Sequence, residues 1–229
     1  MSVLQKLSRH IKQKGLRATL RKIWKHYVFS LEELLWMERD LVTPVPPNKL
    51  RPYPPLRLET ITEQNAVAFT RHFGDRVETM AELAREGHTG HMYLDENGDT
   101  VAFIWGCARN YHDRHYYRCW FPVKEGEFFE FGGEQIRAYW GTLLSLDLQL
   151  NLWKAMQAKG CNTVVDVCEF HNVPALKLHI RMGYQEQGRI MNVYELFGRW
   201  RFFRETHYSG SRLDALRKPA REPAPAAVT

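Results

Sequence analysis

The sequence GCNTVVDVCEFHNVPALKLHIRMGYQEQG, residues 160–188, carries the clearest structural signal of this chain. Residues 163–168 form a short run of mostly β-branched and apolar residues, which predicts a buried strand. Asn172 stands where a helix would begin, and Gly183 stands where it would end. The apolar side of that helix would consist of Ala175, Leu176, Leu178, Ile180 and Met182. We therefore predict a strand, a capped helix and a second extended segment that starts at Tyr184.

Length and composition indicate one globular domain with extensions. The chain has 229 residues, of which 44% are hydrophobic and 25% charged, so it can bury a core. A net charge of +6 favours an anionic partner, which can be nucleic acid, a membrane surface or a phosphate-bearing cofactor. Charge alone does not choose among them.

The cysteines favour a reducing compartment. Cys107, Cys119, Cys161 and Cys168 show neither CxxC spacing nor a disulfide framework, so we expect four free thiols. We find no apolar run of the roughly 20 residues that span a bilayer, and no signal peptide. We expect a cytoplasmic protein, with peripheral contact to a membrane left open.

Residues 1–42 are expected to form a basic amphipathic helical extension. Eight lysines and arginines and no acidic residue precede Glu32, and apolar residues recur at helical spacing. Residues 1–30 are therefore candidates for contact with an anionic membrane surface. The alternative is a helix that covers the rest of the domain and turns its charged face to solvent.

The remaining chain divides into a proline-rich connector over 43–55, a folded domain over 56–210 and a disordered tail over 211–229. Within the domain we expect strands and helices to alternate in a fixed order. The expected segments are a strand at 56–61, helices at 62–73 and 77–86, a hairpin of 91–94 with 100–107, a strand at 126–131, a helix at 135–159 and closing strands at 190–197 and 200–203.

This order of elements, over about residues 56–205, resembles the GNAT superfamily of acyl-CoA-dependent N-acyltransferases. The helix pattern of that family is matched by Asn172, Ala175, His179 and the pair Gly183-Tyr184. The resemblance implies an α/β (α+β) fold with a mixed, mostly antiparallel sheet and helices on both faces. Its fourth and fifth strands would splay apart, and the pantetheine arm of acyl-CoA would lie between them.

The turn that binds pyrophosphate in that family is degenerate here. Of residues 138–143 only Gly141 matches, because Trp140 replaces a common Arg and Leu143 replaces a small residue. The resemblance implies acetyl-CoA, or another acyl-CoA, as cosubstrate. Its expected contacts are Phe131, Tyr139, Trp140, Gly141, Thr142, Leu143, Leu144, Asn172 and Ala175.

Two residues match catalytic positions of the family. A Glu thirteen positions before Trp140 would be the general base, and this count gives Glu127, with Glu130 and Glu134 in reserve. The alternative for Glu127 is a charge at a strand edge. His179, seven positions after Asn172, replaces a Tyr that protonates the CoA thiolate. A hydrogen-bonded histidine without a chemical role is the alternative there.

Residues 109–124, RNYHDRHYYRCWFPVK, form an aromatic and basic loop. We expect Arg109, His112, Arg114 and His115 to contact the acceptor and to favour an anionic or sugar-like one. A homodimer contact is the alternative, and we consider nucleic acid an unlikely partner because the loop matches no RNA-binding signature. The histidine pairs lack the cysteines or carboxylates of a tetrahedral site, so we expect no metal.

The sequence thus predicts an N-acyltransferase that moves an acyl group, foremost acetyl, from acyl-CoA to the amine of a small molecule or peptide. One alternative is a catalytically silent GNAT-fold module that docks on a membrane or a partner protein. Another is an acyltransferase that uses long-chain acyl-CoA or acyl carrier protein.

Overall fold

The computed structural model describes residues 24, 28–47 and 49–217. Its main element is an eight-stranded sheet in the order β10-β9-β1-β8-β7-β4-β3-β2. All neighbours are antiparallel except β7 and β8. The strands are β1 (Phe29–Asp40), β2 (Arg57–Thr60), β3 (Thr89–Leu94), β4 (Thr100–Cys107), β7 (Glu127–Gln135), β8 (Thr163–Glu169), β9 (Gln185–Leu196) and β10 (Trp200–His207).

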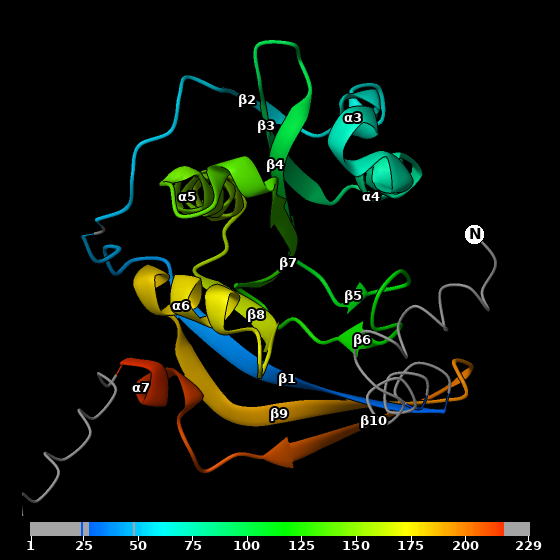
Figure 1. Cartoon of the computed structure of the whole chain (residues 1–229). Helices are drawn as coiled ribbons and strands as arrows, with labels where there is room; N and C mark the ends of the chain where they lie inside the picture. Colours follow the sequence, from blue (N-terminus) through cyan, green and yellow to red (C-terminus); the bar gives the residue numbers. More distant parts are fainter. Residues whose placement is uncertain (1–23, 25–27, 48, 218–229) are drawn as a thin grey trace, which may run out of the picture.

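Helices cover both faces of this sheet (Figure 1). On one face, α5 (Leu144–Gln157), α6 (Val173–Met182) and α7 (Arg212–Arg217) enclose a core with Leu35, Met37 and Phe128. On the other face, a second core contains Leu34, Trp36 and Phe129. It is enclosed by the turn η1 (Ala66–Phe69), helices α3 (Thr70–Phe73) and α4 (Val77–Arg85), and the hairpin of β5 (Tyr111–His112) and β6 (Trp120–Phe121). The turn η2 (Gly74–Arg76) connects α3 to α4.

The central unit of the sequence is confirmed in detail. Residues 163–169 form β8, which lies inside the sheet. The Asn172 side chain accepts a hydrogen bond from the Ala175 N–H at 3.3 Å and caps α6. Gly183 ends the helix with a φ of 83°, a conformation that glycine adopts without steric cost.

Several boundaries differ from expectation. The strand expected at 126–131 extends to Gln135, and a short turn, η3 (Arg137–Tyr139), delays the start of α5 to Leu144. The helix expected over 62–73 is divided between η1 and α3. Residues 212–217 of the expected disordered tail form α7, because Leu213 is buried in the core beside α6.

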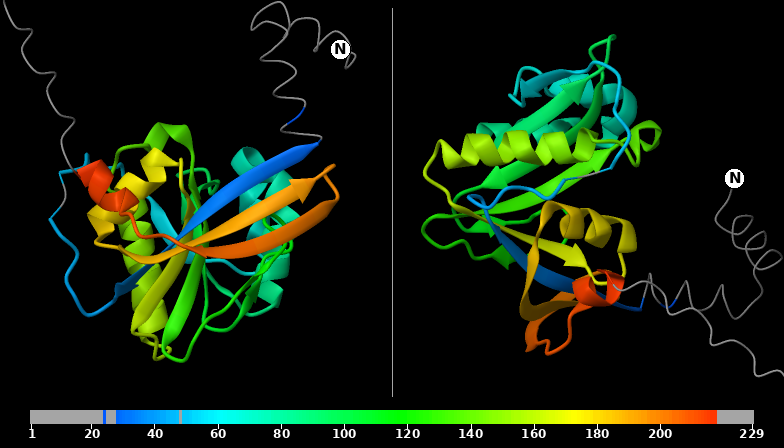
Figure 2. Two further views of the ribbon diagram at one scale, coloured as in Figure 1. Left: turned by 90° about the horizontal axis from the view of Figure 1, so that it is seen from below. Right: turned by 90° about the vertical axis from the view of Figure 1, so that its left-hand side faces the viewer.

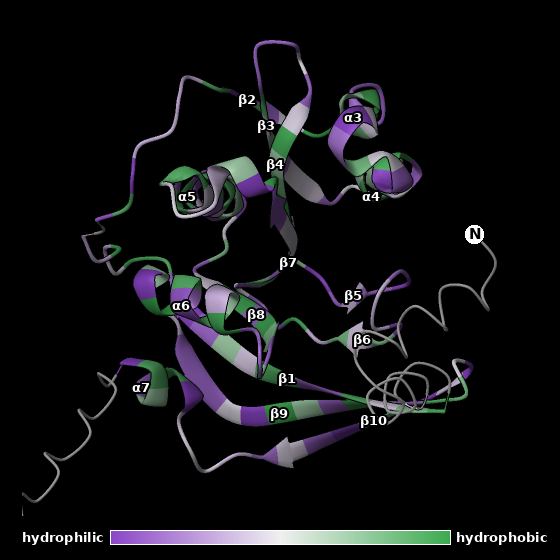
Figure 3. Cartoon of the chain, viewed as in Figure 1, coloured by the Kyte–Doolittle hydropathy of each residue, from purple (hydrophilic) through white to green (hydrophobic). Residues whose placement is uncertain are grey.

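The expectation of a helical extension is wrong for residues 29–40, which form β1 in the middle of the sheet. β1 pairs with β8 on one side and with β9 on the other. Leu34, Leu35, Trp36 and Met37 are all buried, because a central strand with helices or a hairpin on both faces needs apolar residues on both. The middle of β1 is correspondingly hydrophobic (Figure 3). Residues 1–23 and 25–27, the rest of the predicted helical segment, lie outside the described residues.

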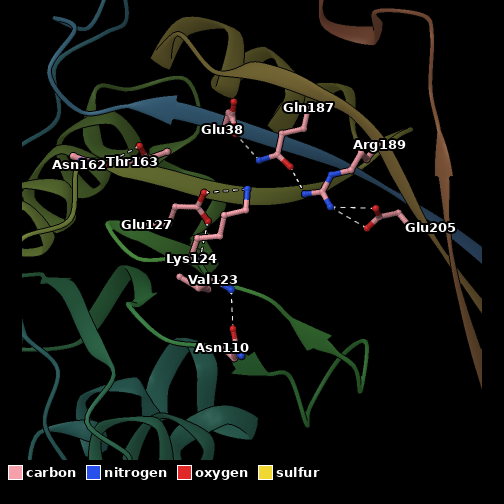
Figure 4. Close-up of polar contacts among 10 residues, drawn as sticks. All are labelled: Glu38, Asn110, Val123, Lys124, Glu127, Asn162, Thr163, Gln187, Arg189 and Glu205. Atoms are coloured by element: carbon pink, nitrogen blue, oxygen red, sulfur yellow. Dashed lines mark hydrogen bonds and ion pairs between the residues drawn. The ribbon is translucent and has the colours of Figure 1, made fainter.

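Strands β1, β9 and β10 run together as a long curved ribbon (Figure 2). Near one end of the ribbon, polar side chains connect the three strands. Gln187 of β9 donates to Glu38 of β1 at 2.6 Å, and Arg189 of β9 pairs with Glu205 of β10 at 3.1 Å (Figure 4). Near the other end of the ribbon, apolar residues line up across the three strands. Phe29, Leu196 and Trp200 form one row, and Leu31, Tyr194 and Phe202 form the next.

The first prediction concerns β1. We expect Trp36→Ala to lower the free energy of unfolding by about 3–5 kcal/mol, because the ring is 1% exposed and packs on Phe121 and Phe129. Trp200→Ala, at a site 54% exposed, should stay within about 0.5 kcal/mol of wild type. Urea denaturation measures both. Equal effects of the two substitutions would contradict the central position of β1.

Candidate functional site

The parallel strands β7 and β8 pair only at their beginnings. Their register joins Glu127 to Thr163, Phe128 to Val164 and Phe129 to Val165. After these three pairs β7 continues along β4 and β8 continues along β1. The expected splay between the fourth and fifth strands of the domain is therefore present, and beyond these pairs the facing edges of β7 and β8 do not pair with one another.

A β-bulge lies in the part of β7 that borders this gap. Trp105 of β4 pairs with Phe131 and Phe103 pairs with Glu134, so β7 carries one extra residue at Gly132-Gly133. Gly132 has a φ of 64°, which a glycine tolerates. Bulges of this kind reorient backbone groups, and this one lies beside a cavity.

A cavity of about 630 Å³ occupies the gap and is lined from both faces of the sheet. Glu130 to Glu134 of β7 form one wall, and Asp166 to Glu169 of β8 form another. Residues of α6 contribute from one face, and residues of α4 and of the 111–121 segment contribute from the other. A molecule that enters from one face can thus meet a molecule that enters from the opposite face.

Glu130 is a carboxyl group buried in the wall of this cavity. It is 2% exposed, and its Oε2 accepts a hydrogen bond from the Trp153 indole N–H at 2.8 Å. Burial, followed by the nearby charge of Asp166, raises the pKa of Glu130 to about 8. A carboxyl group with this pKa exchanges its proton near neutral pH, as a general base requires.

Asp166 and His179 form an ion pair beside Glu130. The His179 Nε2 lies 2.6 Å from Asp166 Oδ2, and its Nδ1 lies 2.8 Å from the Ala175 carbonyl oxygen. A carboxylate and a carbonyl oxygen both accept hydrogen bonds, so this arrangement favours a ring that carries hydrogen on both nitrogens, the imidazolium form. Burial lowers the pKa of His179, but the hydrogen bond and charge of Asp166 outweigh it, and the net shift is upward.

The structure does not bring Glu127 to this cavity. Glu127 lies at the start of β7, where its carboxylate accepts from the Lys124 N–H at 3.0 Å (Figure 4). The Lys124 ammonium lies 3.7 Å from the same carboxylate. Glu127 thus caps a surface turn, whereas both reserve candidates, Glu130 and Glu134, line the cavity. Of the two expected catalytic residues, only His179 lies there.

The expected cofactor contacts divide into two groups. Phe131, Asn172 and Ala175 line the cavity. The others, Tyr139 to Leu144, form the turn before α5 and the first residue of that helix, outside the lining. That turn is covered by the proline-rich connector: Arg51 forms a parallel bridge with Thr142, and the Leu143 N–H donates to the Arg51 carbonyl at 2.8 Å.

Of the four expected acceptor contacts, only His115 lines the cavity. Arg114 pairs with Glu82 at 2.9 Å, and Arg109 donates to the Glu86 carbonyl at 2.6 Å, so α4 holds both cations. His112 stacks on Trp120. Asp166 was not among the predicted site residues, although a carboxylate within an apolar strand is a recognisable signal of a functional site.

Other features carry less information about chemistry. All four cysteines are free, as expected, and all four are buried. Among the described residues, no group of three His, Cys, Asp or Glu side chains is arranged to hold a metal ion. Within the same part of the chain, every helix is too short or too polar to cross a bilayer.

Comparison with known proteins identifies the fold. No protein-family model and no curated protein matches the chain. Among solved structures, a protein of Novosphingobium aromaticivorans assigned to the GNAT family of acetyltransferases matches 73% of this chain, with 15% identity and a TM-score of 0.51. A Drosophila protein matches 82%, with 10% identity and the same TM-score. The chain spans 65% and 59% of those structures, less than two thirds of either. This chain therefore has the GNAT fold, as the order of its elements predicts.

The second prediction follows from the buried carboxyl group. Glu130 has a raised pKa in the folded state, so the folded protein holds a proton that the unfolded chain loses between pH 4.5 and about 8. Stability must then fall as the pH rises through this window. The Glu130→Gln side chain can still accept the hydrogen bond from Trp153 but does not titrate. We therefore expect this variant to lose the fall of the free energy of unfolding with pH, measured by urea denaturation at several pH values. Glu127→Gln should keep the wild-type dependence of stability on pH. The same pH dependence in both variants would contradict Glu130 as the group with the raised pKa.

Proposed function

We propose that this chain, which has the GNAT fold, transfers an acyl group from a thioester to the nitrogen of an amine. The observation that carries the proposal is the cavity between the parted strands, lined by the buried Glu130 and the Asp166–His179 pair. An extended thioester can pair with the open edge of β7, as an added strand would. Of the acyl donors, acetyl-CoA is the first to test.

In this proposal Glu130 is the general base. An amine reaches the site as an ammonium ion, which must lose a proton before its nitrogen can attack. Glu130 accepts that proton, directly or through a water molecule, and its raised pKa makes it a sufficiently strong base. The nitrogen then bonds to the thioester carbonyl carbon, the carbon–sulfur bond breaks, and the thiolate takes the second proton of the amine.

His179 has a different role from the one the family pattern implies. Both of its ring nitrogens are engaged, by Asp166 and by the Ala175 carbonyl, so it has no free N–H for the leaving thiolate. We propose that the imidazolium acts as a fixed positive charge in the cavity wall, which stabilises negative charge on the leaving sulfur. Asp166 holds the ring in place and keeps it protonated.

The charges of the cavity support a cationic amine as the acceptor. Its acidic lining residues outnumber the basic ones, which are Arg76, His115 and His179. Arg76 is paired with Glu134 at 2.8 Å, and His179 is paired with Asp166. The anionic acceptor expected from the 109–124 loop is therefore replaced by an ammonium compound in this proposal. The acidic residues are Asp75, Asp113, Glu130, Glu134, Asp166 and Glu169.

The third prediction tests catalysis through thiol release from acetyl-CoA with a panel of small and peptide amines. We expect Glu130→Gln to lower kcat/KM about 100-fold or more, the usual contribution of a general base. Wild-type kcat/KM should rise with pH through the pKa of about 8 that Glu130 carries. Glu127→Gln, altered in the same strand outside the cavity, should stay within about twofold of wild type. Full activity of Glu130→Gln would eliminate the base assignment.

A second candidate function, docking on a membrane, is supported by the aromatic rows on β1, β9 and β10. Trp200 and Phe202 are 54% and 55% exposed on one face of the ribbon. Exposed aromatic residues with a basic neighbouring sequence suit an anionic lipid surface, and residues 1–28 contain eight lysines and arginines. This role is compatible with catalysis and also with a silent module.

The fourth prediction is that the protein co-sediments with vesicles containing phosphatidylserine and less with neutral vesicles. The double substitution Trp200→Ala and Phe202→Ala should reduce binding, because it removes apolar surface that enters the interface. Trp140→Ala, at an exposed site elsewhere, is the control. Unchanged binding of the double variant would exclude this face as the contact.

A further inference from the structure

Gln149 of α5 is a buried polar side chain to which the proposed reaction gives no role. It is 6% exposed and lines the cavity between β7 and β8. Its carbonyl oxygen, Oε1, is fully buried and accepts no hydrogen bond from any described residue. The other buried residues of α5 are leucines, Trp153 and Met156. Buried polar groups nearly always have hydrogen-bond partners, so the missing partner of Gln149 requires an explanation.

Three residues of α5 spaced four apart show where Gln149 lies along the gap. Residues with this spacing lie on one side of a helix, about 6 Å apart along its axis. Gln157 donates to the Leu41 carbonyl at 3.1 Å, beside the start of β8. Trp153, one turn earlier, donates to Glu130 of β7. Gln149 comes a further turn earlier, so it lies beyond Glu130, where β7 and β8 no longer pair.

The surroundings of Gln149 favour a ligand over a lone water molecule. Ile104, Ala175 and Leu178 line the cavity from the same face of the sheet, and all three belong to the apolar core or pack against it. A buried water molecule needs about two to four polar partners. His179, on the same face, already has partners for both ring nitrogens. A ligand that brings its own N–H group satisfies the Gln149 oxygen without further partners from the protein.

We propose that Gln149 binds an amide group in the arm of the acyl donor, and that it thereby selects thioesters carried on amide-containing chains. The proposal rests on the proposed function, because that function requires a thioester arm in this gap. The pantetheine arm of acyl-CoA contains secondary amides. The Gln149 oxygen accepts from the N–H of such an amide, and the Gln149 NH2 group donates to its carbonyl oxygen. One side chain thus pairs with both polar groups of one amide, at a distance from the thioester itself.

Thiol release from two donors tests this role. Gln149→Met keeps the length of the side chain but removes its hydrogen-bonding groups. We expect it to lower kcat/KM for acetyl-pantetheine about five- to tenfold, mainly through a higher KM. For S-hexyl thioacetate, whose arm has no amide, kcat/KM should stay within about twofold of wild type. Gln157→Met, changed on the same side of α5 but outside the cavity, is the matched control and should leave both donors unchanged. An equal loss for both donors in Gln149→Met, or no loss for either, would overturn the proposal.

Binding and stability measurements decide the proposal without turnover. By calorimetry, we expect Gln149→Met and Gln149→Leu to raise the Kd of acetyl-CoA about five- to tenfold. In urea denaturation of the ligand-free protein, their midpoints should equal or exceed that of wild type, because each variant loses a buried group without a partner. Lower midpoints with an unchanged Kd would show that Gln149 serves packing alone, and would overturn its role in binding. Wild-type protein that does not bind acetyl-CoA at millimolar concentration would contradict the proposed function as well, whereas wild-type binding that both variants retain would contradict only the role of Gln149.

Discussion

The structure depends on one constraint: two parallel strands stop pairing while both remain inside the sheet. Backbone N–H and C=O groups in a protein interior need partners. The backbone groups on one edge of β7 pair with β4, and those on one edge of β8 pair with β1. Each strand therefore remains ordered after the two separate. The two facing edges are left to the cavity. The gap is thus a stable feature of the sheet, held open by its neighbours on either side.

The polar groups of the site follow from this constraint. Apolar cores lie on both faces of the sheet, and between them only the gap admits water or a ligand. Glu130, Asp166 and His179 come from three different elements and meet there. Their mutual charges determine which of them is protonated: His179 is held as a cation by Asp166, and the same carboxylate helps to keep Glu130 neutral. The half-buried Asp166 carboxylate therefore influences the charge of both Glu130 and His179.

The sequence predicted correctly those features of the structure that depend on residues close together in the chain. Three such features are the helix cap at Asn172, the helix end at Gly183 and the apolar run of β8. Each could be predicted because it depends on residues within a few positions. His179 was found by the same logic, since its distance from Asn172 along a regular helix is preserved. Glu127 was found by counting back from a turn of which only Gly141 matches, and the structure gives that turn a different partner, Arg51. β1 was missed because its apolar run follows a segment with helical spacing, and only the tertiary pairing with β8 and β9 distinguishes the two.

The position of β1 also constrains how the chain reaches its native state. The partner of β1 in β8 lies more than 120 positions later in the sequence, and the pairing of β1 with β9 runs as far as residue 196. The apolar residues 34–37 therefore stay unpaired until these later strands have been synthesised. Folding that depends on contacts between segments far apart in the sequence is slow, and it leaves apolar surface exposed to other chains. Until β8 and β9 have been synthesised, this apolar segment is a natural client for a chaperone, because half of the sheet can assemble only with those later strands.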